Sequence, residues 1–277
     1  MATKNQETFA ILTDTTRCTG CEACVHACKQ TYDLGRDRAW RWKRKVDDLS
    51  STRFTTIISR PGSRHVRQQC RHCLEPACVS ACLVGALQKT EIGPVIYDEK
   101  RCMGCRYCMM ACPYGIPRYK WESPVPLVRK CILCYDRIKA GKQPACTQAC
   151  PYDATIFGTR AEMLAEAHRR IEAHPGKYAP SGSPKVYGEH EVGGTSVLYI
   201  SDVPLDFLGW QPELGNEPVP ALTWGALRKV PPVALGVAAL MSGVYWVIGR
   251  RMHLQAEAEE AQAAARLGDG DSTPRES

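Results

Sequence analysis

The chain of 277 residues has little of what normally fills a protein core. Only four phenylalanines and six tryptophans are present, and large apolar runs are scarce before residue 220. A chain of this length is long enough for one large domain or two small ones, and either needs a real core. Something besides large side chains must supply the interior, and sixteen cysteines are available to do so.

The sequence also lacks the patterns that mark a substrate site. No Ser-His-Asp set, Gly-rich phosphate loop or pterin-binding signature is evident. Such patterns place a nucleophile beside its base or hold a phosphate group. We therefore expect that the chain is not itself an enzyme and performs no chemistry on a substrate.

The cysteines fall into four groups of four, with none left over. Three groups read CTGCEACVHAC, CRHCLEPACVSAC and CMGCRYCMMACP, and the fourth is split between CILC and CTQACP. In a bacterial ferredoxin, three cysteines of a C-x-x-C-x-x-C-x-x-x-C run bind one [4Fe-4S] cluster, and the fourth, often followed by proline, binds the cluster of a partner run. Proline follows Cys112 and Cys150 but not Cys28 or Cys82. We expect iron-sulfur clusters that are bound by pairs of runs.

Two other uses of cysteine are alternatives. Disulfide scaffolds have even cysteine counts, but they are usually short, and thiols three or four residues apart wrap a metal more readily than they join distant loops. Structural zinc is bound by C-x-x-C pairs, but normally by two pairs that lie far apart. A membrane-tethered zinc-binding scaffold is the alternative from a different functional class, and it predicts a colourless protein with zinc and no iron.

The order and spacing of the four groups resemble those of the four-cluster electron-transfer subunits of the molybdopterin oxidoreductase family. The wider spacing of the second group and the split in the fourth carry this resemblance. GAL at 85–87 and YDATIFGTRAEM from Tyr152 fit the turn and strand that follow each run in that family. VYGEHEVGGTSVLYI at 186–200 is similar to a segment of the beta subunits of membrane-bound formate dehydrogenases and of a related membrane-bound hydrogenase. The resemblance covers about residues 10 to 250.

This resemblance implies an α+β fold: two nested bacterial-type 2x[4Fe-4S] ferredoxin modules plus a C-terminal single transmembrane helix. The double ferredoxin-like domain would span 1–185, with an outer module around 10–60 and 125–160 and an inner module around 65–122. The resemblance also implies four [4Fe-4S] clusters, because all sixteen positions are cysteine. The implied ligands are Cys18, Cys21, Cys24 and Cys150 for cluster 1; Cys131, Cys134, Cys146 and Cys28 for cluster 2; Cys70, Cys73, Cys78 and Cys112 for cluster 3; and Cys102, Cys105, Cys108 and Cys82 for cluster 4.

One long apolar run lies towards the C-terminus. VPPVALGVAALMSGVYWVIG, at 230–249, contains twenty residues without a charge and has two basic residues on each flank. That length spans a bilayer, and the alternative is a buried core helix. We expect an extension and Pro/Gly-rich connector at 186–222, a transmembrane helix at 223–251, and a polar tail at 252–277 that contains a short separate helix, LQAEAEEAQAAARL. No histidine lies in the run, so a haem or quinone site would belong to a partner subunit.

The formal net charge of +7 and the stretch RAWRWKRKV at 38–46 have the basic and aromatic character of a nucleic-acid footprint. Four oxidised clusters with their thiolates carry about eight negative charges, which offset this excess. We therefore expect no nucleic-acid partner and interpret the stretch as a solvated or partner-facing strand. Basic residues beside the cysteine runs are candidates for raising cluster potentials: Arg17, Arg71 and Arg106.

Two further patterns have ordinary structural interpretations. His26 and His72 lie inside cysteine runs, but no cysteine is missing for them to replace as histidines do in Rieske centres. We expect both to be cluster-pocket or surface residues. The stretch at 159–174 begins with a capping box, Thr159 and Glu162, and predicts a packed helix. Its expected apolar face consists of Met163, Leu164, Ala167 and Ile171.

The N-terminal stretch MATKNQETFAILTD has neither a hydrophobic signal region nor a twin-arginine pair, which alone favours the cytoplasm. Formate dehydrogenase beta subunits also lack a signal and are exported already folded with the catalytic subunit. The resemblance therefore implies a single-pass protein of the bacterial inner membrane with its cluster domain on the periplasmic side.

The resemblance implies an iron-sulfur subunit that relays electrons between a catalytic subunit and a membrane cytochrome b or quinone site. The expected catalytic subunit is a molybdenum or tungsten pterin enzyme similar to formate dehydrogenase. A nickel-iron hydrogenase, or a quinol-linked reductase of a sulfur or nitrogen oxide, is the alternative partner.

Overall fold

The computed structural model divides into two compact units, residues 1–222 and 223–277. The basic stretch at 38–46 and the last residues of the predicted tail lie outside the described part of the chain. The residues that the structure describes are 8–35, 49–121, 123, 127–178, 185–204, 206–210 and 214–268.

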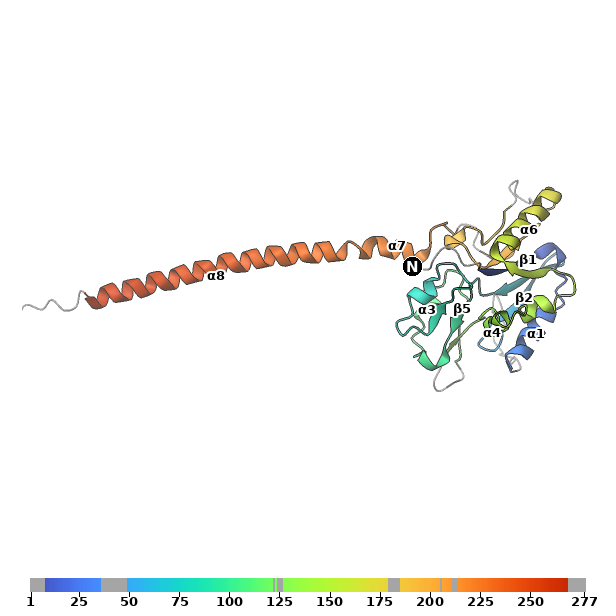
Figure 1. Ribbon diagram of the computed structural model, residues 1–277, viewed down its shortest axis with the longest axis horizontal. Coiled ribbons are helices and arrows are strands. Elements are labelled where there is room, and N and C mark those ends of the chain that lie inside the picture. The colour runs from blue at the N-terminus through green and yellow to red at the C-terminus, as the bar shows by residue number, and fades with distance from the viewer. Residues whose placement is uncertain are drawn as a thin grey trace, which may run out of the picture. The chain divides into compact units, whose positions relative to one another are not determined.

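A three-stranded sheet forms the centre of the first unit (Figure 1). Its middle strand, β1 (Phe9–Asp14), is antiparallel to β8 (Thr155–Thr159) and parallel to β9 (Val197–Ile200). Successive side chains of a strand point to opposite faces, and both faces of β1 are buried here. One face of this strand packs under a long helix, and the other faces a core that contains cysteine side chains.

The long helix is α6 (Arg160–Ala173), which Figure 1 shows beside β1. Thr159 accepts a hydrogen bond from the Glu162 backbone, and the Glu162 carboxylate accepts one from the Thr159 backbone, so the predicted capping box is formed. Met163, Ala167 and Ile171 are buried against the sheet. Leu164 packs against the same core as a partly buried residue. The prediction of a packed amphipathic helix is confirmed.

The described residues also form three two-stranded antiparallel hairpins. The turn GAL leads directly into β4 at Leu87, and the stretch from Tyr152 leads into β8, so both predicted strands are confirmed. The hairpins are β2 (Thr55–Arg60) with β3 (Arg64–Gln69), β4 (Leu87–Lys89) with β5 (Val95–Tyr97), and β6 (Arg118–Tyr119) with β7 (Val128–Arg129).

Short helices lie within or beside the cysteine runs. The helix of the first run packs against a helix of the fourth, and the helix of the second packs against that of the third. The first pair is α1 (Ala23–Thr31) with α5 (Ala145–Gln148), and the second is α2 (Ala77–Ser80) with α3 (Tyr107–Ala111). The remaining short helices are η1 (Thr15–Arg17), η2 (Glu99–Arg101), α4 (Tyr135–Lys139) and η3 (Glu191–Gly193).

The second unit contains most of α7 (Val219–Leu227) and all of α8 (Val230–Gly268). Two boundary predictions were wrong, because helix begins inside the predicted connector, at Val219, and the polar segment after residue 251 continues α8 without a break. That polar segment is rich in alanine, glutamate, glutamine and arginine and has no glycine or proline before the end of the helix. These residues favour helix strongly, so nothing ends the helix where the apolar run stops.

The apolar run lies within α8. The helical stretch Val219–Ala265 is long and apolar enough to cross a membrane, and its most apolar window is not buried at all. A core helix of a soluble protein would be mostly buried. The alternative of a buried core helix is therefore not supported by the described residues.

Candidate iron-sulfur cluster sites

All sixteen cysteines lie in the described part of the chain, and each thiol is free. Only Cys21 is exposed, and the others are buried or partly buried. The four ligand groups that the resemblance implies are named here set 1 to set 4. Set 1 is Cys18, Cys21, Cys24 and Cys150; set 2 is Cys28, Cys131, Cys134 and Cys146; set 3 is Cys70, Cys73, Cys78 and Cys112; set 4 is Cys82, Cys102, Cys105 and Cys108.

In set 1, three thiols of the first run lie beside a thiol from the end of the fourth run. Burial raises the pKa of Cys24 to about 12, and Cys18 and Cys150 add to the shift. Burial also raises the pKa of Cys18, with smaller contributions from Cys150 and Cys21. These effects place Cys18 near Cys21 and Cys150, and Cys24 near Cys18 and Cys150, although Cys146 of set 2 adds more to the shift of Cys24 than either.

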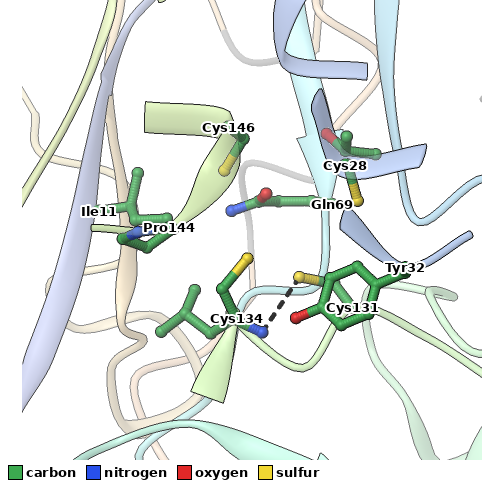
Figure 2. Close-up of a pocket in the computed structure, with 10 residues that line it drawn as sticks. Ile11, Cys28, Tyr32, Gln69, Cys131, Cys134, Pro144 and Cys146 are labelled. Atoms are coloured by element: carbon green, nitrogen blue, oxygen red, sulfur yellow. Dashed lines mark hydrogen bonds between the residues drawn. The ribbon is translucent and has the colours of Figure 1, made fainter. Parts of the chain in front are cut away.

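Set 2 lines an enclosed pocket between β1, α1 and the loops around α4 (Figure 2). The four sulfur atoms point towards one space, and the Gln69 amide also points into it. Burial raises the pKa of Cys131 well above its ordinary value, and the other three thiols of the set add to the shift. The Leu133 backbone N–H donates to the Cys131 sulfur at 3.3 Å, and the Ala145 N–H donates to the Cys134 sulfur at 3.5 Å. Such N–H donors favour the thiolate form.

Set 3 combines the second run with the last cysteine of the third. Burial raises the pKa of Cys73, and Cys70, Cys112 and Cys78 raise it further. The Ile116 backbone N–H donates to the Cys112 sulfur at 3.5 Å. The set therefore has the same construction as set 2, with thiols from two runs and a backbone donor.

Set 4 combines the third run with the last cysteine of the second. Burial raises the pKa of Cys108 to about 11, and Cys102, Cys105 and Cys82 raise it further. The Ala86 N–H donates to the Cys82 sulfur at 3.2 Å. The surface around this set is apolar and exposed: Leu83, Met103, Tyr107 and Met110 are exposed by 71%, 63%, 54% and 87%.

The donor chemistry of the four sets fits [4Fe-4S] clusters. Within the described ranges, no three His, Cys, Asp or Glu residues converge closely enough to hold a single metal ion. A zinc ion needs four ligand atoms about 2.0–2.3 Å from one centre. In a cubane, each of the four thiolates binds a different iron, so the sulfurs surround a larger object. Bound iron also deprotonates thiols that burial otherwise keeps neutral.

Neighbouring sets are linked by pairs of nearby thiols. Cys146 of set 2 raises the pKa of Cys24 in set 1, and Cys70 of set 3 raises that of Cys131 in set 2, although burial is the larger cause in both. Cys108 of set 4 likewise adds to the effect of burial on Cys78 in set 3. The same pairs pack in shared clusters, Cys24 with Cys146, Cys70 with Cys131 and Cys108 with Cys78, and these contacts favour the order 1, 2, 3, 4.

The residues at 186–200 join the sheet to the loop of the second cysteine run. β9 pairs with β1, while the Leu74 N–H donates to the Gly194 carbonyl at 3.0 Å. The Ser196 N–H donates to the Arg71 carbonyl at 3.1 Å. Gly194 has φ +91°, and a Cβ there would lie 2.9 Å from a backbone oxygen, so only glycine fits. This segment holds set 3 in place against the sheet that borders set 2.

The two predicted pocket or surface histidines differ in position. His26 is exposed, and His72 is fully buried. The His72 Nδ1 accepts a hydrogen bond from the Val95 N–H at 2.9 Å. Burial lowers the pKa of His72, and the nearby ammonium groups of Lys130 and Lys89 lower it further, so its ring is neutral. The surface position of His26 is confirmed, and a place for His72 beside a cluster stays a prediction.

Basic residues beside the cysteine runs have different surroundings. The Arg71 guanidinium lies 4.2 Å from the ring centroids of both Tyr199 and Trp210. The Arg106 guanidinium lies over the Tyr119 and Trp121 rings, at 5.2 and 5.5 Å. Arg17 Nε lies 3.7 Å from an Asp14 carboxylate oxygen. Their predicted effect on cluster potentials stays a prediction.

Sequence reasoning missed several buried polar residues near the thiols. Lys130 Nζ donates to the carbonyls of Val95 and Cys131, at 2.5 and 2.9 Å. Arg67, Gln69 and Tyr32 also lie against cysteine side chains. The only signal in the sequence is proximity to a cysteine run, which many exposed residues share. Which side chain points inwards depends on the pairing of β2 with β3 and on the loop paths.

Comparisons with known proteins agree with this chemistry. Residues 63–160 match the 4Fe-4S dicluster domain family. A protein of Nitratidesulfovibrio vulgaris is 41% identical over 93% of this chain and 71% of its own length. The hydrogenase-2 operon protein HybA of Escherichia coli O157:H7 is 36% identical over 72% of each chain. The iron-sulfur subunit of the nitrate-inducible formate dehydrogenase of Escherichia coli K12 is 33% identical over 85% of this chain and 82% of its own. This chain therefore belongs to the family of [4Fe-4S] electron-transfer subunits of oxidoreductase complexes.

Proposed function

We propose that each of sets 1 to 4 holds one [4Fe-4S] cluster and that electrons pass through the chain one at a time along the row of clusters. The observation that carries this proposal is the row itself, in which each set has a thiol beside a thiol of the next. The packing of α1 on α5 and of α2 on α3 supports two nested ferredoxin modules. The outer module would hold clusters 1 and 2, and the inner module clusters 3 and 4.

The surroundings of the sets suit electron transfer. When bound, the clusters supply one-electron oxidation and reduction. The protein supplies a dry pocket and backbone N–H donors to sulfur, which hold the ligand geometry and influence the potential. The N–H groups of Leu133, Ala145, Ile116 and Ala86 do this in sets 2, 3 and 4. We propose that the chain itself catalyses no reaction on a substrate.

Both ends of the row reach the surface. Cys21 of set 1 is the only exposed cysteine among the sixteen, and set 4 has exposed Met103, Tyr107 and Met110 around it. Electrons can therefore enter near one terminal cluster and leave near the other. One end would face the catalytic subunit, and the other a membrane cytochrome b or quinone site.

For the catalytic partner, we favour a molybdenum or tungsten enzyme similar to formate dehydrogenase. The formate dehydrogenase relative aligns with 85% of this chain, a larger share than the 72% for the hydrogenase-operon relative. A nickel-iron hydrogenase is the second candidate, because the identity to HybA is slightly higher, at 36% against 33%. We further propose that α8 anchors the chain in the bacterial inner membrane, with the clusters on the periplasmic side.

The test is isolation of the native complex from membranes, followed by metal analysis and mass spectrometry of the subunits. We expect about sixteen irons on this chain and molybdenum or tungsten in the partner. Nickel in the partner would replace formate dehydrogenase by hydrogenase as the assignment. Zinc without iron would overturn the electron relay altogether.

A further inference from the structure

Arg67 is a buried cation that forms no ion pair with a carboxylate among the described residues. It lies on β3, opposite Ile57 of β2, and is only 1% exposed, which makes it the largest fully buried side chain. Its Nε, Nη1 and Nη2 atoms form no hydrogen bond. Its backbone carbonyl accepts a hydrogen bond from the Tyr199 hydroxyl at 3.0 Å, which holds this part of the strand in place.

An arrangement of this kind is costly unless a negative group lies beside the guanidinium. Arginine stays protonated in proteins, and an isolated buried charge is strongly destabilising. The side chain of Arg67 lies against the sulfurs of Cys146 and Cys24. The sulfur ligands are therefore the groups that balance this charge.

The two cysteines beside Arg67 belong to different sets. Cys24 is in set 1 and Cys146 is in set 2. Arg67 also lies near Cys18 of set 1 and Cys28 of set 2. A different buried cation, Lys130, lies near Cys78 of set 3. Arg67 thus lies between the two sets of the outer module.

We propose that Arg67 is a shared counterion of clusters 1 and 2, which donates N–H groups to their sulfur ligands and raises both reduction potentials. This inference rests on the proposed function. Reduction adds one electron to a cluster that is already negative, so a fixed positive charge nearby stabilises the reduced form. Because one guanidinium lies beside both sets, its removal changes both clusters and leaves clusters 3 and 4 nearly unchanged.

Arg71 is a second buried arginine in the same core, with different neighbours; its Nε and Nη1 atoms also form no hydrogen bond. Its guanidinium lies against the Tyr199 and Trp210 rings, and Nη2 donates to the Gln68 side chain at 3.1 Å. Aromatic faces and a side-chain amide balance part of its charge. Arg67 has no such neighbour in the described core, and this difference points to the cluster sulfurs as its partners.

The experiment is an EPR-monitored redox titration of the membrane-derived complex with Arg67→Met, Arg67→Lys and Arg64→Gln. The iron content of each variant is measured first. Arg64 is the matched control, because it lies on the same strand and pairs with Asp202 at 2.7 Å but is 42% exposed.

In Arg67→Met, we expect the reduced-to-oxidised ratio at a fixed potential to fall at least about tenfold for two clusters, because the variant loses a positive charge and its hydrogen bonds to the sulfur ligands. Tenfold corresponds to about 59 mV for one electron. Arg67→Lys keeps the charge and shifts both clusters less, and Arg64→Gln shifts none. Unchanged potentials in a fully loaded Arg67→Met variant would overturn the inference and leave the electron relay standing.

A second measurement tests the inference even if Arg67→Met does not fold. Pulsed EPR on the reduced complex labelled with ¹⁵N-arginine detects nitrogen close to a cluster. We expect a ¹⁵N coupling in the wild type that is lost in Arg67→Lys and kept in Arg64→Gln. If the coupling is absent, or if it persists in Arg67→Lys, Arg67 is not the counterion. A wild-type complex without iron would instead overturn the proposed function.

Discussion

The first and third cysteine runs have the same local construction but opposite surroundings. Each begins with an aspartate, Asp14 or Asp98, whose carboxylate accepts the N–H of the residue two positions later. A 3-10 helix, the first cysteine and a left-handed residue, Glu22 or Arg106, then precede the helix of the run. Asp14 is fully buried, whereas Asp98 is 42% exposed.

This difference shows what the long-range contacts add. Asp14 accepts hydrogen bonds from Tyr178, at 2.9 Å, and from Arg170, at 3.2 Å, which lie far away in the sequence. Asp98 pairs only locally, with Arg101 at 3.3 Å, among the contacts given for the described residues. The same loop therefore forms from local sequence in both runs, and the tertiary structure decides how dry and how rigid each one is.

Removal of iron should have the largest effect on the fold. We expect it to unfold the first unit and to leave the helix of the second unit intact. The first unit has thiol-lined pockets in its core, whereas α8 is helical without any thiol. We expect chelation under reducing conditions to abolish the strand signal of the first unit in far-UV circular dichroism and to preserve the helical signal of α8 in detergent. Cooperative melting of an iron-free first unit would contradict this expectation.

Substitution of single cysteines should affect the clusters of the two modules differently. Cys24→Ser removes a proposed ligand of cluster 1, and Cys108→Ser removes a proposed ligand of cluster 4. We expect each variant to lose about four to eight of the sixteen irons and to lose quinone-linked turnover, because every cluster is a step of one relay. The EPR signals that disappear should differ between the two variants. Normal turnover with a full iron count in Cys24→Ser would refute its assignment as a ligand.

Asp14→Asn and Asp98→Asn each remove the charge of a loop aspartate. The stability that each variant loses compares a buried carboxylate with an exposed one. Asp14→Asn weakens hydrogen bonds to a buried Arg170 and Tyr178, so we expect a loss of about 2 kcal/mol, or about 4–8 °C in melting temperature. Asp98→Asn removes an exposed pair and should cost below about 1 kcal/mol. Thermal loss of the visible cluster absorbance measures both. Equal losses would mean that burial of the first loop contributes nothing.

The smallest expected effect is at the capping box of α6. Thr159→Ala removes a side chain that accepts the Glu162 N–H, and we expect a loss of about 1 kcal/mol. Glu162→Gln retains an acceptor for the Thr159 N–H and should cost less. The melting temperature of the two variants checks this order, and a larger loss for Glu162→Gln would contradict it.

Local patterns predicted local structure well in this chain. The helix at 160–173 and the strands that begin at Leu87 and Thr155 follow from capping, periodicity and turn signals within a few residues. The end of α8 was predicted wrongly, because a change from apolar to polar composition does not stop a helix without a glycine, proline or cap. Composition indicated where the apolar window lies, and backbone propensity decided where the helix ends.

The cysteine spacing alone determined that this chain binds iron-sulfur clusters, because ligand spacing is a property of a few neighbouring residues. The tertiary structure decided which runs lie together, the order of the four sets, and which residues face the sulfurs. Arg67 illustrates the difference: three positions from an exposed arginine on the same strand, it is buried between two sets. Burial of a charge depends on elements far apart in the chain, β2, β9 and α5 among them, and no local pattern records their packing.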